Sequence, residues 1–238
     1  MRKVFPKNSI PRNKISGKIS GKKFDILCMD IIFLYLCYID FIDMTKKEFK
    51  NEVGSISTAA VRRVDELLRP LELTVNIDWE YDFDSPYYRE CIGVYEMDTV
   101  FSGEIRIGFN MDLLCKTFMK EVRDYPFSDP HTMLDELIYT NVYHEVGHGL
   151  VNLLRDYLEE SDDLDTLYDA NKELFDNVLD NEEEAVEEFA WSFYDNDLGE
   201  SDLWCVVELY LGMCKDNGIA ESYLGRVVDE CISDLLLR

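Results

Sequence analysis

Apolar residues recur every three to four positions from Thr45 to about Arg69, and Pro70 follows as a stop signal. This spacing predicts an amphipathic helix, because residues three and four apart share one helical face. Thr45 and Glu48 form the Thr-x-x-Glu pattern of a capping box, in which each side chain bonds the backbone of the other residue. The helix is therefore expected to begin just after Thr45.

From Leu71 to Tyr81 the period changes to two, with apolar residues alternating with polar ones. Such alternation predicts a half-buried strand. Two further strands are predicted over Glu90–Met97 and Gly103–Phe109. Because the connections between these strands are short, we expect an antiparallel meander.

Helical spacing returns over about Met111–Val122, and Asp129-Pro130 then marks the start of a long helix that continues to about Leu158. An acidic N-cap followed by proline at the first helical position is a strong start signal. Further helices are predicted over residues 164–179, 201–215 and 221–237, besides an acidic one around residues 182–190. The pattern indicates an α+β fold, in which a small antiparallel or mixed sheet packs on the long helix and a helical C-terminal part follows.

The first 43 residues differ in charge from the rest of the chain. They carry eight Lys or Arg and four Asp, whereas residues 44–238 carry sixteen basic and forty-five acidic residues. Their apolar run over residues 31–39 has only nine residues, too few to span a bilayer. We interpret residues 1–43 as an extension, poorly ordered or a misassigned start, and residues 44–238 as the functional domain.

The formal net charge of −25 argues against nucleic acid and anionic membrane as partners, since both repel an acidic protein. Seven scattered cysteines without a C-x-x-C pair are typical of reduced thiols in a cytosol. The sequence therefore predicts a cytoplasmic protein, and it does not indicate an oligomeric state.

The candidate chemistry lies in the middle of the long helix, at His144-Glu145-Val146-Gly147-His148. Positions i and i+4 share one helical face, so both imidazoles can reach one metal ion. Glu145 is placed to act as a general base in this HExxH arrangement, which predicts zinc-assisted hydrolysis. The alternative is an accidental motif in a helical binding protein. Gly147 and Gly149 lower helix propensity by about 1 kcal/mol each, a feature typical of places where backbone or substrate approaches closely.

A zinc ion held by His144 and His148 needs a third protein ligand. The acidic helix around residues 182–190 offers several glutamates, although a solvated acidic face would look the same. Glu183 shares the phase of the apolar stripe, so we select it as the metal ligand, with Glu184 as the second choice. Glu187, one turn after Glu183, is placed to accept a hydrogen bond from the far nitrogen of a metal-bound histidine.

The HExGH helix follows predicted strands and precedes a second helix with an E-x-x-[A/V]-x-x-F-A pattern, formed by Glu183, Val186, Phe189 and Ala190. This combination resembles gluzincin-type zincins, and within them the ImmA/IrrE-like metallopeptidases. The resemblance implies a zincin-like fold and Glu183 as third ligand. The family's usual Asn or Asp four residues later is Glu187 here, and its Leu-Leu-Met-Pro continuation is replaced by residues 191–195.

The resemblance also implies a mechanism, in which Glu145 deprotonates a water molecule activated by zinc. A protein or peptide substrate would lie beside an edge strand, for which residues 103–109 are the best candidate. Tyr143, Tyr194 and His131 are weak candidates for an additional oxyanion donor. The alternative function is a catalytically silent, zinc-stabilised acidic module that binds a basic protein partner.

Overall fold

The computed structural model describes residues 44–71, 73–84, 88–96, 104–160 and 162–216. The predicted extension over residues 1–43 and the predicted helix over residues 221–237 lie outside these ranges. The described part is an α+β structure with seven α-helices and a three-stranded mixed sheet. Within it, no helix combines the length and apolar character needed to cross a bilayer.

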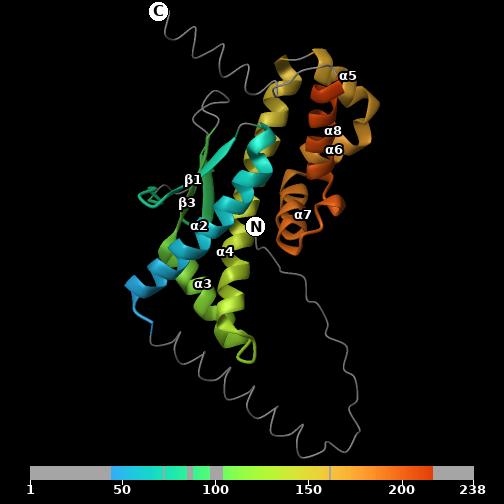
Figure 1. The fold of residues 1–238 in the computed structure, drawn as a ribbon. Helices are drawn as coiled ribbons and strands as arrows, with labels where there is room; N and C mark the ends of the chain where they lie inside the picture. Colours follow the sequence, from blue (N-terminus) through green and yellow to red (C-terminus); the bar gives the residue numbers. More distant parts are fainter. Residues whose placement is uncertain (1–43, 72, 85–87, 97–103, 161, 217–238) are drawn as a thin grey trace, which may run out of the picture.

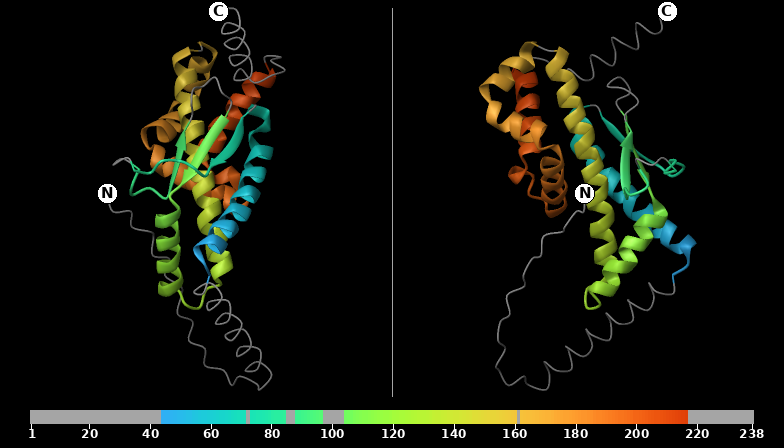
Figure 2. Two further views of the ribbon diagram at one scale, coloured as in Figure 1. Left: turned by 90° about the vertical axis from the view of Figure 1, so that its left-hand side faces the viewer. Right: turned by 180° about the vertical axis from the view of Figure 1, so that it is seen from behind.

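Helix α4 (Pro130–Glu160) runs through the middle of the molecule (Figures 1 and 2). The sheet and helix α2 (Lys46–Leu68) lie on one side of it, and helix α7 (Glu182–Asp195) packs along the other. Because α4 is covered from several directions, apolar residues occur around most of its circumference. Its buried residues include Leu134, Ile138, Val142, Val146, Leu150 and Leu154.

The two predicted helix starts are confirmed. Thr45 and Glu48 form a capping box at the start of α2, with Thr45 N donating to Glu48 Oε2 at 2.8 Å. Helix α4 begins at Pro130, and the Asp129 carboxylate accepts hydrogen bonds from the backbone N–H groups of His131 and Thr132. These side chains supply partners for N–H groups that have no acceptor within the helix.

The sheet contains β1 (Thr74–Asp78), β2 (Gly93–Glu96) and β3 (Glu104–Phe109) in the order β1-β3-β2. Strand β3 is antiparallel to β2 and parallel to β1. The predicted meander is therefore wrong, because β1 pairs with the far side of β3 instead of with β2. The first strand is also shorter than predicted, since Leu71 belongs to the 3₁₀ turn η1 (Arg69–Leu71) and Trp79 to a turn.

In the described residues after α4, the chain forms four helices and a 3₁₀ turn, η2 (Leu198–Glu200). The helices are α5 (Asp162–Ala170), α6 (Lys172–Asp180), α7 and α8 (Asp202–Asp216). The single helix predicted over residues 164–179 is wrong, because the chain breaks at Asn171 into α5 and α6. Helix α3 (Met111–Asp124) and α8 follow the predicted ranges within two residues.

Candidate metal centre

His144 and His148 lie on one face of α4, and their Nε2 atoms are 3.2 Å apart. Both side chains are largely buried, with 14% and 13% of their surface exposed. A tetrahedral zinc ion with Zn–N bonds of about 2.0–2.1 Å holds two nitrogens about 3.3–3.4 Å apart. The two imidazoles therefore have the spacing that one shared zinc ion requires.

Glu183 completes a group of three residues that could hold a metal ion. Its Oε1 lies 3.7 Å from His148 Nε2, and one ligand atom of each residue lies within 4.8 Å of the others. Glu184, the second choice from the sequence, is exposed and does not belong to this group among the described residues.

The helical phase of Glu183 predicts a side chain that points along the apolar stripe of α7, and the structure differs from this prediction. Its side chain is 68% exposed, so it does not point into the core along the apolar stripe of α7. Its carboxylate nevertheless lies 3.7 Å from His148 Nε2.

Each histidine also has a carboxylate near its other nitrogen. Glu187 Oε2 lies 3.5 Å from His144 Nδ1, and Glu187 Oε1 accepts a hydrogen bond from Trp191 Nε1 at 2.9 Å. The predicted place of Glu187 beside a histidine is thus seen, but the contact is long. His144 Nδ1 is buried without a hydrogen bond among the described residues, so this nitrogen is poorly satisfied.

Glu182 makes the stronger contact, and sequence reasoning missed it. Its Oε1 lies 2.5 Å from His148 Nδ1, and its Oε2 accepts a hydrogen bond from Arg155 Nη1 at 2.6 Å. The sequence does contain a signal for Glu182. It precedes Val186 by four residues and Phe189 by seven, and this spacing places it on their face of α7. Only 23% of its side chain is exposed, which distinguishes it from Glu183.

The protonation states of His148 and Glu182 favour metal binding by His148. Burial lowers the pKa of His148 and outweighs the opposing effect of Glu182, so the imidazole tends to be neutral, the form that binds metal. Burial alone would raise the pKa of Glu182, but the hydrogen bonds from His148 and Arg155 hold it below its usual value. An ionised carboxylate only accepts hydrogen bonds, so His148 donates through Nδ1 and directs the lone pair of Nε2 toward His144.

Glu145 is buried, with 8% of its surface exposed, and lies against the edge of the sheet. A Cβ atom added at Gly93 in β2 would lie 2.9 Å from Glu145 Oε1 and 3.1 Å from its Cγ. Glycine at position 93 therefore provides the space in which the Glu145 carboxylate lies. The proposed base therefore packs against the backbone of β2.

Tyr95, two residues further along β2, covers His148. The two rings are stacked, with centroids 5.6 Å apart and an interplanar angle of 8°. The Tyr95 hydroxyl accepts a hydrogen bond from Asn152, one turn after His148. Burial raises the pKa of Tyr95, and the nearby charges of Glu182 and Glu145 add to this effect. No local signal in the sequence identifies Tyr95, because its contact with His148 spans 53 positions.

The two glycines of the HExxH region allow two different elements to approach α4. A Cβ atom at Gly147 would lie 2.9 Å from Val186 Cγ1 in α7. One at Gly149 would lie 2.8 Å from Ile105 Cδ1 in β3. The expectation of close approach at these glycines is confirmed, and the partners are a neighbouring helix and a strand.

The three candidates for an oxyanion donor have different surroundings. Tyr143 is buried in the core, where its ring contacts Phe193, Tyr139 and Arg63. Tyr194 packs against Tyr139 and Trp191. His131 is thirteen residues before His144, about 20 Å along the helix axis, and therefore lies outside the site.

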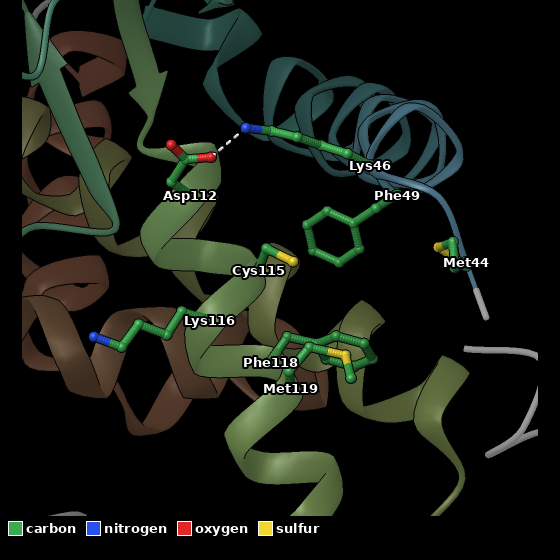
Figure 3. Close-up of a pocket in the computed structure, with 8 residues that line it drawn as sticks. All are labelled: Met44, Lys46, Phe49, Asp112, Cys115, Lys116, Phe118 and Met119. Carbon is green, nitrogen blue, oxygen red and sulfur yellow. Dashed lines mark hydrogen bonds and ion pairs between the residues drawn. The ribbon is translucent and has the colours of Figure 1, made fainter. Parts of the chain in front are cut away.

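A separate hollow of about 320 Å³ lies between the start of α2 and α3 (Figure 3). Its lining is mainly apolar, and Lys46 forms an ion pair with Asp112 at 2.5 Å beside it. None of the glutamates and histidines described above line it. The chemistry of the histidine cluster is thus independent of this hollow.

Comparison of the chain with protein-family models, with curated proteins and with solved structures finds no match.

Proposed function

We propose that this protein is a zinc-dependent metallopeptidase with a zincin-like fold, similar to the ImmA/IrrE-like enzymes. The observation that carries the proposal is the pair of Nε2 atoms 3.2 Å apart, with Glu183 beside them and the buried Glu145, the residue after His144, packed against the sheet edge. His144, His148 and Glu183 are the proposed ligands. Zinc held there would polarise a peptide carbonyl and make water a stronger nucleophile near neutral pH.

The chain's own residues supply the remaining parts of the reaction. Glu145 would take a proton from the attacking water and pass it to the leaving amine as the C–N bond breaks. Its position against Gly93 limits the rotamers that its side chain can adopt. The Tyr95 ring stacks on the His148 ring and covers one of its faces.

The proposed substrate strand lies along β2, and the prediction that residues 103–109 form the edge strand is wrong. Strand β3 is the central strand and pairs on both sides. Asn110 N donates to Ile92 O, so in the antiparallel ladder Val94 and Glu96 also face β3. The backbone N–H and C=O groups of Gly93 and Tyr95 then face the other edge, where no strand pairs with them among the described residues. A peptide can add there as a further strand.

The proposal includes a cytoplasmic location. In the described part of the chain, Cys91, Cys115 and Cys205 are free thiols, in keeping with a reducing compartment. A protein or peptide is the proposed substrate, and the charge of −25 disfavours nucleic acid as a partner.

The second candidate function is a zinc-stabilised acidic module that binds a basic partner without cleaving it. The exposed Glu183, Glu184, Glu187 and Glu188 on α7 favour this alternative, since they present negative charge beside the site. A module of this kind gains nothing from a buried carboxylate one residue after a metal ligand, so the two functions differ in the role of Glu145.

The test compares wild type with Glu145→Gln, using Glu184→Gln as the matched control on α7. We expect about one zinc ion per chain in all three proteins, measured by elemental analysis. Hydrolysis of a quenched fluorescent peptide library should fall about 10²- to 10⁴-fold in Glu145→Gln, because a general base contributes that much, and stay unchanged in Glu184→Gln. Zinc-loaded wild type that cleaves no better than Glu145→Gln would favour the acidic module, and a protein without zinc would refute both functions.

A further inference from the structure

Arg155 lies on the same face of α4 as the histidines, seven residues after His148. Its guanidinium has two partners on different elements. Nη1 donates to Glu182 Oε2 at 2.6 Å, and Nη2 donates to the backbone carbonyl of Leu179 at 2.9 Å. The planar fork of an arginine suits such a double contact, which a lysine ammonium reproduces poorly.

The two partners of Arg155 lie on either side of the α6–α7 junction. Helix α6 ends at Asp180 and α7 begins at Glu182, with only Asn181 between them. Leu179 belongs to the last turn of α6, where carbonyl groups have no partner within the helix. Arg155 therefore satisfies the end of α6 and also holds the first residue of α7 against α4.

The contact continues from Glu182 to the candidate metal centre. The same carboxylate that accepts from Arg155 through Oε2 contacts His148 Nδ1 through Oε1 at 2.5 Å. Both oxygens are thereby fixed, and the ring of His148 is oriented with Nε2 toward His144. Carboxylates that accept from a metal-binding histidine orient its ring and raise its basicity.

We propose that Arg155 is a positioning residue for the metal centre, acting through Glu182 to orient His148. This inference rests on the proposed function, since it concerns the ligands of the same zinc site. Arg155 itself does not touch the three ligand atoms. It determines how the α6–α7 junction, and with it the acidic end of α7, presents Glu182 to the histidine.

The corresponding arrangement at His144 is looser. Trp191 holds Glu187 at 2.9 Å, but Glu187 lies 3.5 Å from His144 Nδ1. An indole N–H is also a weaker partner for a carboxylate than a charged guanidinium. Loss of Arg155 is therefore expected to weaken metal binding more than loss of the Trp191 hydrogen bond.

The experiment measures zinc affinity by competition with a chelator in the full chain. We expect Arg155→Gln and Glu182→Gln each to weaken zinc binding 10- to 100-fold, the range found for residues that support metal ligands. Arg155→Lys should recover part of the affinity, because it keeps a charged donor for Glu182. Trp191→Phe should have the smaller effect. Arg123→Gln is the matched control, since Arg123 also donates to a helix carbonyl, that of Met119 at 2.9 Å, but on α3.

A double variant separates positioning from general stabilisation. Arg155→Gln combined with Glu182→Gln should bind zinc no more weakly than the weaker single variant, because both act along one chain of contacts. The visible spectrum of bound Co²⁺ should change in the same variants if the ligand geometry changes. Additive losses, or an unchanged zinc affinity together with a lower melting temperature in Arg155→Gln, would show that Arg155 is only structural.

The outcome for wild type distinguishes the two proposals. If wild type binds no zinc, the proposed function fails and this inference fails with it. If wild type binds zinc and the Arg155 variants bind it equally well, only the positioning role is refuted. Arg155→Lys keeps the test valid should Arg155→Gln fail to fold.

Discussion

Glu121 on α3 lies near Glu136 on α4, and its environment makes stability depend on pH. Burial raises the pKa of Glu121, and the charge of Glu136 raises it further. A carboxyl group whose pKa is raised by folding stabilises the fold while it is protonated, and this contribution is lost as the pH rises through the folded-state pKa. At neutral pH the ionised Glu121 therefore lowers the free energy of unfolding.

Replacement of Glu121 with Gln should remove this penalty. We expect Glu121→Gln to raise the free energy of unfolding by about 0.5 kcal/mol at pH 7–8, a size typical of partly exposed positions. The gain should shrink as the pH falls toward the usual carboxyl range near 4.3. Urea denaturation between pH 8 and pH 5 measures it, with the exposed Glu66→Gln on α2 as control. A gain that is constant over this range would show that ionisation is not the cause.

At the scale of elements, the site depends on how closely α7 approaches α4. Gly147 is the position at which these helices meet, because any side chain there would overlap Val186 and Phe189. Among the described residues, the carboxylates that contact the histidines, Glu182, Glu183 and Glu187, come from the first two turns of α7. A small change in the distance between the helices therefore moves the proposed third ligand and both supporting carboxylates together.

Gly147→Ala should accordingly weaken both the fold and the metal site. We expect the free energy of unfolding to fall by about 1–3 kcal/mol from overpacking, offset by up to about 1 kcal/mol of helix propensity. Zinc affinity should fall with it. Gly212→Ala on α8 is the matched control, since nothing lies within 4 Å of an added Cβ there, and it should be neutral or stabilising. Equal effects of the two substitutions in urea denaturation would contradict a close approach at Gly147.

At the scale of the whole molecule, the proposed metal joins two separate parts of the chain, and the proposed base contacts a third. Its ligands come from the middle of α4 and the start of α7, and the proposed base packs against β2. A metal ion that binds only the folded chain stabilises all of these contacts together. We therefore expect zinc to raise the stability of the whole domain, which should unfold in a single cooperative transition.

Free zinc at 100 times its dissociation constant should stabilise the fold by about 2.7 kcal/mol. For a domain of this size, that corresponds to a rise in melting temperature of about 5–10 °C. Thermal unfolding in zinc and in excess chelator measures the difference. His148→Ala should abolish the response, and Glu184→Gln should keep it. Identical melting temperatures of wild type with zinc and with chelator would argue against a zinc site.

The sequence by itself determined those features that depend on neighbours along the chain. The capping box at Thr45, the start of α4 at Pro130 and the shared face of His144 and His148 all follow from local backbone geometry, and the structure has each of them. Gly147 was identified as a point of close approach for the same reason, because its lack of a side chain is visible in the sequence.

Only the tertiary structure decided which elements lie side by side. The strand order β1-β3-β2, the edge position of β2 and the contacts of Tyr95 and Arg155 join residues far apart in sequence. The tertiary structure also decided the roles of Glu182 and Glu183. These two residues are neighbours in the sequence, and the phase of the apolar stripe does not distinguish between them. The structure distinguishes them by burial, since the Glu182 side chain is 23% exposed and that of Glu183 is 68% exposed. Periodicity along one helix carries no information about how α7 packs on α4.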